Sequence, residues 1–160
     1  MKYSNDTVRR RDRLLPEADA RALLASGEYA TLSMAAENGG AYGVPVNYAW
    51  DGNDSVYIHC AREGRKLKCV ARDPKVSLCV VGKTRVLPEK FSTEYESVIL
   101  FCRAEIVADE AEKMRALEML LEKYSPAFKG AGMKYAASSL ARAEIARLEI
   151  LSASGKARRG

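Results

Sequence analysis

One segment of the sequence places a histidine, a cysteine and two adjacent cations around a glycine. The residues that could do chemistry there are His59, Cys60, Gly64, Arg65 and Lys66. Side chains up to Cys60 alternate as in a strand, and after Gly64 the apolar side chains recur at helical spacing until Pro74. The segment therefore predicts a strand, a tight turn and a helix whose first turn contains both cations.

Arg65 and Lys66 stand at the end of this predicted helix that is least favourable for cations. The helix dipole is positive there, so each misplaced charge costs about 0.3–1 kcal/mol. A bound anion reverses that sign, because free backbone N–H groups and two cations together form a phosphate site. Alternatively, the cations only form the hydrated surface of an exposed helix and bind no ligand. The charge pattern alone favours neither interpretation. The cations of the segment are Arg62, Arg65, Lys66, Lys68 and Arg72.

Two further polar residues are open to more than one interpretation. His59 is the single histidine of the chain, and near a strand end it serves either as a structural hydrogen-bonding residue or as an acid–base group. No Ser-His-Asp arrangement is recognisable around it. Asn47 lies on the small-residue face of its predicted strand, where it could hydrogen-bond a flat heterocycle or simply end a ladder.

Strands joined as hairpins are the elements that must position these residues. Six strands are predicted, over 28–35, 41–50, 55–60, 75–82, 97–107 and 144–151. In the strand at 41–50, large apolar residues share one face and small residues the other, and Pro45 indicates an edge or a bulge. Residues 83–95, which include a proline, are expected to form a long connection.

Helical patterns occur between the hairpins. Helices are expected from Pro16 to Gly27, from Gly64 to Pro74, from Asp109 to Pro126 and near 133–141, with a glycine-containing loop at 129–132. No strand–helix–strand alternation runs along the chain, and no G-x-G-x-x-G follows a strand, which excludes the ordinary dinucleotide-binding fold. The elements predict a mainly β fold, a six-stranded antiparallel barrel with peripheral helices.

The chain has 160 residues, 48% of them hydrophobic and 29% charged, which predicts one folded domain and excludes wholesale disorder. No apolar run approaches the roughly 18 residues of a membrane span, and the first residues lack a signal-peptide pattern. Four cysteines without a C-x-x-C pair predict buried, reduced thiols and no metal site. We therefore expect a soluble, cytoplasmic protein.

The net charge of +5 is concentrated at the two ends of the sequence. Residues 1–13 and 154–160 each carry +3, so the remaining 140 residues sum to −1. The expected organisation is a basic tail at 1–13, one domain at 14–153 and a second basic tail at 154–160. A nearly neutral domain without an aromatic and basic binding motif argues against nucleic acid as the partner, apart from weak contacts of the tails.

Four segments together resemble one family. They are Arg9–Arg13, Gly43–Tyr48, Tyr57–Leu67 and Ser97–Ala104. From about residue 8 to Lys156, the chain resembles flavin-binding split-barrel proteins, and most of all the Nim-type (5-nitroimidazole-resistance-related) branch of the pyridoxamine 5'-phosphate oxidase-like superfamily. The resemblance implies a six-stranded split barrel that forms a homodimer with two FMN molecules at the subunit interface.

The same resemblance implies cofactor-binding roles for Val44, Pro45, Val46, Asn47, His59, Cys60, Gly64, Arg65, Lys66 and Ser97. The stretch from Val44 to Asn47 would follow the isoalloxazine edge, with His59 and Cys60 near the ribityl chain and the ring. Arg65 and Lys66 would hold the phosphate, and Ser97 would face the partner's flavin. His59 is also the candidate catalytic residue, because it matches an active-site position of the Nim-type branch.

The family pattern also has departures in this chain. Cys60 stands where oxidase members favour a hydroxyl residue, and a C-terminal Arg/His pair for the vitamin substrate is missing. These departures argue against transferring the pyridoxamine phosphate activity to this chain. The function that the resemblance implies is an FMN-dependent oxidoreductase that reduces small aromatic or nitro-heterocyclic compounds, with NAD(P)H as a candidate donor. The alternative is a non-catalytic carrier or sensor that binds flavin or haem.

Overall fold

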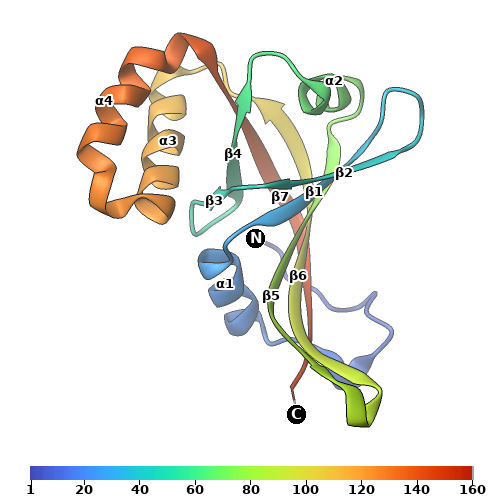
Figure 1. Cartoon of the computed structure of the whole chain (residues 1–160). Coiled ribbons are helices and arrows are strands. Elements are labelled where there is room, and N and C mark those ends of the chain that lie inside the picture. Colours follow the sequence, from blue (N-terminus) through green and yellow to red (C-terminus); the bar gives the residue numbers. More distant parts are fainter. Residues whose placement is uncertain (160) are drawn as a thin grey trace.

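The computed structural model describes residues 1–159, which form seven strands in one antiparallel sheet with four α-helices around it (Figure 1). The strands are β1 (Ala30–Ala35), β2 (Ala41–Val46), β3 (Ala49–Trp50), β4 (Ser55–Ala61), β5 (Lys75–Leu87), β6 (Ser92–Ile106) and β7 (Ala143–Arg158). The helices are α1 (Glu17–Ser26), α2 (Arg65–Arg72), α3 (Glu110–Tyr124) and α4 (Lys129–Ser139). The mainly β antiparallel fold with peripheral helices is thus confirmed.

The prediction of six strands was wrong, because the expected strand at 41–50 is broken into β2 and β3. The backbone N–H of Tyr48 donates to the hydroxyl of Tyr124 at 3.0 Å, and that hydroxyl lies 3.1 Å from the Tyr48 carbonyl. The same hydroxyl donates to the carbonyl of Glu28 at 2.8 Å. A side chain from α3 therefore occupies the backbone N–H of Tyr48, which a continuous strand would offer to a neighbouring strand. The buried Tyr48 hydroxyl donates to the carbonyl of Leu24 at 2.6 Å.

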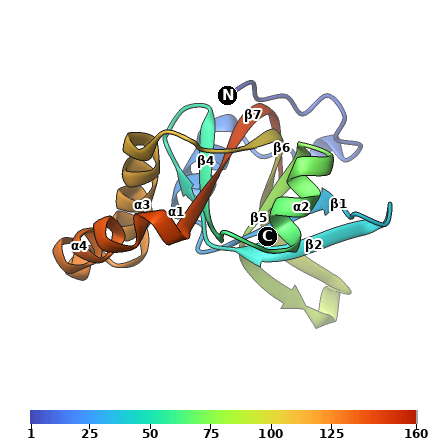
Figure 2. The ribbon, with the colours of Figure 1, turned by 90° about the horizontal axis from the view of Figure 1, so that it is seen from above.

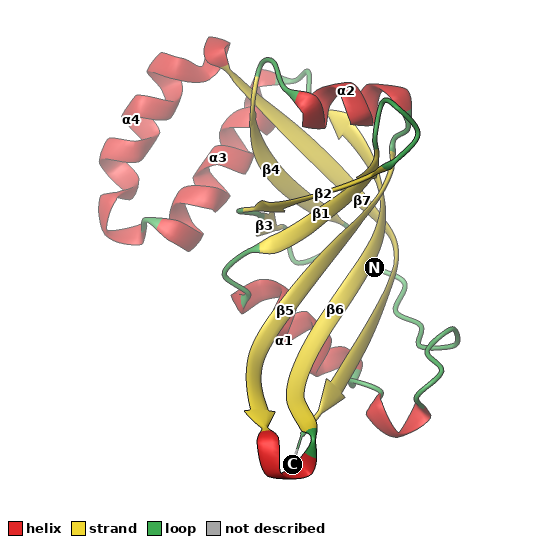
Figure 3. Cartoon of the chain, turned by 45° about the vertical axis from the view of Figure 1, so that its right-hand side comes forward, coloured by secondary structure: helices red, strands yellow, loops and turns green. Residues whose placement is uncertain are grey.

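The sheet does not close into a complete barrel. Its strand order is β2-β1-β5-β6-β7-β4-β3, so that β2 and β3 are opposite edges of the sheet although they are consecutive in the chain. Only Asn47 and Tyr48 join these edges, and we call this pair the β2–β3 link. The strongly curved sheet is visible in Figure 3.

The expected connection at 83–95 is instead the end of a long hairpin. β5 continues to Leu87, a short 3₁₀ turn spans Pro88–Lys90, and β6 begins at Ser92. Most side chains of this hairpin end are exposed or half-exposed, so it lacks the alternation that marks a half-buried strand. In Figure 1 the hairpin projects away from the helices.

The expected loop at 129–132 is also wrong, because both of its glycines belong to α4. A Cβ atom on Gly132 would lie 2.5 Å from Cδ2 of Leu121 in α3. The glycine therefore permits close packing of two antiparallel helices and does not mark a loop. Figure 2 shows α3 and α4 together at one side of the sheet, with α2 over one end of it.

The inner face of the curved sheet forms the core. Its largest fully buried side chains include Leu32, Ile58, Leu78, Leu100 and Leu148, and α1 adds Leu24 to the same cluster. Each helix within residues 1–159 is too short or too polar to span a bilayer.

Residues at the beginning of the chain run beside the lower half of β7. Ser4 donates its N–H to the carbonyl of Ala153 at 2.9 Å, and Leu15 donates to the carbonyl of Gly155 at 3.1 Å. β7 itself extends to Arg158, and residue 160 of the predicted C-terminal tail lies outside the described residues. Both predicted basic tails therefore contain residues with backbone hydrogen bonds to the sheet.

Candidate functional site

A cavity of about 410 Å³ lies where the β2–β3 link, β4, α2 and α3 meet. We call it the main cavity, and its lining residues are Pro45, Val46, Asn47, His59, Lys66, Leu117, Leu120, Leu121, Tyr124 and Ser125. Five of the ten residues that the resemblance singles out are thus brought together. The cavity has one polar side, with an amide, an imidazole and an ammonium group, and one side of leucine side chains.

The leucine side comes from α3, and sequence reasoning did not assign it to a site. Leu117 and Leu121 recur at helical spacing, a pattern that predicts an ordinary packed stripe. In the structure Ala116 is the only fully buried residue of α3, and the leucines that face the main cavity are half-buried. A helix position cannot be paired with a strand 60 residues away by periodicity alone, so no local signal identifies this wall.

The first turn of α2 has backbone donors without acceptors inside the helix. The first helical hydrogen bond runs from the N–H of Lys68 to the carbonyl of Gly64 at 3.3 Å, so three earlier amides precede it. No side chain caps this end, and its first turn contains no acidic residue. The predicted strand, turn and helix are confirmed, and the free amides and cations at this helix end give it the properties of an anion site.

Arg65 and Lys66 point to different sides of α2. Lys66 lines the main cavity, and its charge adds to the effect of burial, which is the larger cause of the lowered pKa of His59. The guanidinium of Arg65 lies 4.5 Å from the ring centroid of Tyr42, and Arg65 lines a second hollow of about 520 Å³. The structure thus places Lys66 beside His59 and places Arg65 on the far side of the helix end.

The loop before α2 is tied to the rest of the fold by one carboxylate. Glu144 of β7 accepts a hydrogen bond from the ammonium of Lys113 in α3 at 2.9 Å, and it lies 3.7 Å from Nε of Arg62. Lys113 and Glu144 are both largely buried, so this ion pair is less screened than a surface pair. It connects the position of α3 with that of the loop that leads into α2.

Five of the ten predicted binding residues do not line the main cavity: Gly64 and Arg65 line the second hollow, and Val44, Cys60 and Ser97 lie elsewhere. Cys60 points into the core, where burial raises the pKa of its thiol. Val44 packs against the same core. Ser97 lies on the outer face of β6, opposite Val81 and Lys156.

The ammonium of Lys123 lies at the β2–β3 link without a hydrogen-bond partner among the described residues. Its Nζ is 3.5 Å from the ring centroid of Tyr48 and 5.4 Å from that of Tyr124. Burial lowers its pKa to about 8, while the two aromatic faces favour the charged form. Lys123 therefore fixes the end of α3 against the link, a role that the sequence pattern does not reveal.

We expect the pKa of His59 to lie below its ordinary value of about 6.5. Burial is the larger cause, and the nearby charge of Lys66 is the smaller one. Lys66→Gln should raise the pKa of His59, and a phosphate bound beside the imidazole should raise it further, because an anion favours the imidazolium. Since the chain has one histidine, a single Hε1 resonance in an NMR titration measures both shifts. A pKa unmoved by Lys66→Gln would show that the two side chains do not interact in solution.

Comparison with known proteins identifies the fold. Residues 16–157 match the family model described as pyridoxamine 5'-phosphate oxidase. No curated protein matches the sequence. A solved structure of a candidate 5-nitroimidazole antibiotic resistance protein from Bacteroides thetaiotaomicron superposes with a TM-score of 0.73 at 17% identity, covering 91% of this chain and 86% of that one.

Two further solved structures are similar over most of the chain. A flavocytochrome from Azotobacter vinelandii has a TM-score of 0.71 at 25% identity, covering 91% of this chain and 68% of its own. A FAD-binding protein from Mesorhizobium loti has a TM-score of 0.66 at 20% identity, covering 92% of this chain and 98% of its own.

Proposed function

Because the chain belongs to the pyridoxamine 5'-phosphate oxidase family, we propose that its main cavity binds FMN and that the protein is a flavin-dependent oxidoreductase. Two of the similar solved structures are described as a flavocytochrome and a FAD-binding protein, which supports a flavin in this chain as well. The observation that carries the proposal is the uncapped first turn of α2, which has two cations and no acid, at the margin of a cavity.

The residues of the main cavity fit the chemistry of FMN. A phosphate group needs N–H donors and a cation, and the α2 terminus with Lys66 supplies both. A flat heterocycle needs apolar contact on its face and hydrogen bonds at its edge, which the leucines of α3 and the Pro45–Asn47 stretch can supply. Arg65 would reach the same phosphate after leaving the ring of Tyr42.

In this proposal the flavin supplies the electron transfer, and the protein supplies binding, orientation and exclusion of water. Asn47, exposed at the end of β2, would hydrogen-bond the edge of the ring. His59 is neutral at pH 7, because burial and Lys66 lower its pKa, so it would act as a hydrogen-bonding group or proton acceptor beside the ring. Leu117 and Leu120 would keep water from the ring face and favour flat, apolar substrates such as small aromatic or nitro-heterocyclic compounds.

The functional unit in this proposal is a homodimer. The outer face of the sheet carries the exposed apolar residues Val81, Ile99, Phe101 and Leu151, and we call this set the outer-face patch. Small side chains surround it, because Ser77 and Ser152 lie opposite Phe101 on the neighbouring strands. An apolar patch set among small residues suits close contact with an identical sheet. Ser97 lies on this same face, where it would reach the partner's flavin.

Purification without added cofactor tests the proposal directly. The protein should retain yellow flavin whose mass after denaturation is that of FMN. Under anaerobic conditions it should reduce a nitro-heterocycle with NADPH or NADH as donor, at a rate that depends on the bound flavin. Retention of flavin without such turnover would support the carrier or sensor function instead, and a colourless protein that ignores added FMN would contradict both.

A further inference from the structure

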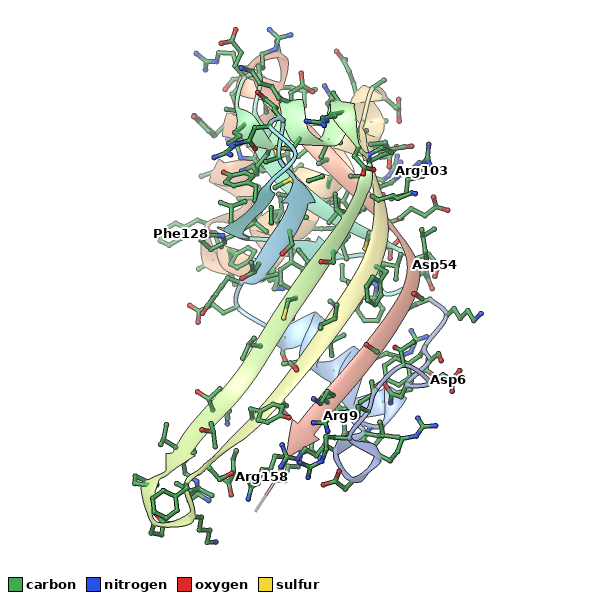
Figure 4. The ribbon with its side chains drawn as sticks, turned by 90° about the vertical axis from the view of Figure 1, so that its right-hand side faces the viewer. Asp6, Arg9, Asp54, Arg103, Phe128 and Arg158 are labelled. Carbon is green, nitrogen blue, oxygen red and sulfur yellow. The ribbon has the colours of Figure 1, made fainter. Side chains whose placement is uncertain are left out.

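The two basic ends of the sequence lie together in the folded chain. Leu14 forms a β-bridge with Lys156, and the side-chain carbonyl of Asn5 accepts a hydrogen bond from the N–H of Gly155 at 3.0 Å. Figure 4 shows Arg9 and Arg158 at the same end of the molecule, next to the β5–β6 hairpin. The positive charges of the two ends of the sequence therefore lie on a single basic surface, and no local pattern predicts that the two ends meet.

A hollow of about 560 Å³ lies in this surface, between the β5–β6 hairpin and the end of β7. We call it the hairpin hollow, and its lining residues are Lys83, Thr84, Arg85, Glu94, Tyr95, Glu96, Arg158 and Arg159. Four cations and two carboxylates give it a net charge of +2. It shares no residue with the main cavity of the same chain.

Two of the four cations are held in fixed directions. Arg159 donates to Asp19 of α1 at 2.8 Å and to Glu96 at 3.3 Å, and Arg85 donates to Glu94 at 2.6 Å. The position of Glu96 depends on a glycine, because a Cβ atom on Gly82 would lie 2.6 Å from its Cγ. Charge-assisted hydrogen bonds thus orient these two exposed arginines along the wall of the hairpin hollow.

The side-chain charges of the other two cations, Lys83 and Arg158, have no hydrogen bond or ion pair with any of residues 1–159, although the backbone of Arg158 belongs to the β6–β7 pairing. The pairing of β5 with β6 shifts between Val81 and Thr84, so the backbone is irregular at Lys83. Such bulges re-aim side chains, and many occur beside functional sites. The half-buried Arg158 lies opposite Tyr95, which in turn lies opposite Thr84, so these three residues share one face. Two unneutralised cations thus flank an aromatic ring and a hydroxyl.

We propose that the hairpin hollow binds a nucleotide through its pyrophosphate group. Lys83 and Arg158 would contact the phosphates, and the ring of Tyr95 would offer a face on which a base can stack. The volume of about 560 Å³ lies in the range of small-ligand sites, whereas a nucleic-acid duplex binds across an extended surface. A nicotinamide dinucleotide is the reductant that the proposed function needs, and its hydride must pass to a flavin beside the hollow. Ser97, next to Glu96 of the hollow, is the residue proposed to face the partner's flavin, so the identity of the ligand rests on the proposed function and its homodimer. The phosphate site itself rests only on the geometry of the hollow.

Calorimetric titration of NADPH into the full chain without bound FMN tests this site, and NADP⁺, which cannot reduce the flavin, replaces NADPH when FMN is bound. The double variant Lys83→Gln/Arg158→Gln should weaken NADPH binding by about tenfold or more, because it removes two charge-assisted contacts. The control Lys75→Gln/Lys90→Gln removes the same charge from exposed positions outside the hollow and should change the affinity less than about twofold. Equal affinities of the wild type and the Lys83/Arg158 variant would overturn the proposal.

Further binding measurements identify which ligand supplies the pyrophosphate group. If the Lys83/Arg158 variant weakens binding of FAD but not of FMN, the hollow takes the adenylate half of a flavin, which supports the pyrophosphate site. A single-stranded RNA oligonucleotide that binds tightly and is not displaced by NADPH would overturn it in favour of a nucleic-acid surface. NADPH binding that depends on the hollow in a chain that never retains flavin would contradict only the proposed function. A yellow protein without NADPH binding would contradict only this inference.

Discussion

Replacing Lys66 with alanine is expected to weaken FMN binding by about 10- to 100-fold without lowering the stability of the protein. A hydrogen bond between an ammonium and a phosphate contributes about 1.5–3 kcal/mol, which corresponds to that loss of affinity. In the free protein, the same cation stands at the positive end of the α2 dipole, where it is unfavourable by about 0.3–1 kcal/mol. The substitution should therefore leave Tm unchanged or raise it slightly, so the affinity and the stability do not fall together.

Riboflavin, which lacks the phosphate, is the decisive comparison ligand. Lys66→Ala should weaken FMN binding, measured by quenching of flavin fluorescence, and leave riboflavin binding almost unchanged. The double variant Arg65→Ala/Lys66→Ala should lose more affinity for FMN, because Arg65 can leave the ring of Tyr42 to reach the phosphate. Lys75→Ala, an exposed lysine on β5, serves as the matched control. Undiminished FMN affinity in the double variant would show that the phosphate lies elsewhere.

Local pattern was sufficient to predict the part of the site that is contiguous in the sequence. The strand that ends near Cys60, the turn at Gly64 and the helix that begins at Arg65 follow from alternation, a glycine and helical spacing. Such a pattern does not predict which of two adjacent side chains in the first turn of the helix faces the cavity. The separation of Lys66 from Arg65 therefore became visible only in the structure.

Contacts between distant segments explain what the sequence did not predict. The break between β2 and β3 depends on the hydroxyl of Tyr124, 76 residues further along the chain. The leucine side of the main cavity depends on where α3 packs, and the hairpin hollow depends on Arg159 reaching Asp19 across 140 residues. Each of these features is specified by tertiary packing, for which a single sequence carries no periodic signal.

The outer-face patch leads to the prediction with the largest effect on assembly. Phe101 is 49% exposed in the single chain, and Ser77 and Ser152 on the neighbouring strands leave its ring accessible. Burying a phenylalanine contributes about 1.5–3 kcal/mol, and a two-fold symmetric interface contains the residue twice. Phe101→Glu should therefore raise the dimer dissociation constant by at least about 100-fold, which sedimentation velocity would measure as conversion to monomer.

Phe128 provides a matched control, since it is 73% exposed but lies in the turn between α3 and α4 (Figure 4). Phe128→Glu adds the same charge to the surface and should leave the dimer intact. If Ser97 and its neighbours complete the partner's flavin site, the Phe101→Glu monomer should also lose FMN, although none of the residues of the main cavity has changed. A dimer that survives Phe101→Glu would refute this interface. A monomer that keeps its full FMN affinity would instead place the whole flavin site within one chain, between α2, the β2–β3 link and α3.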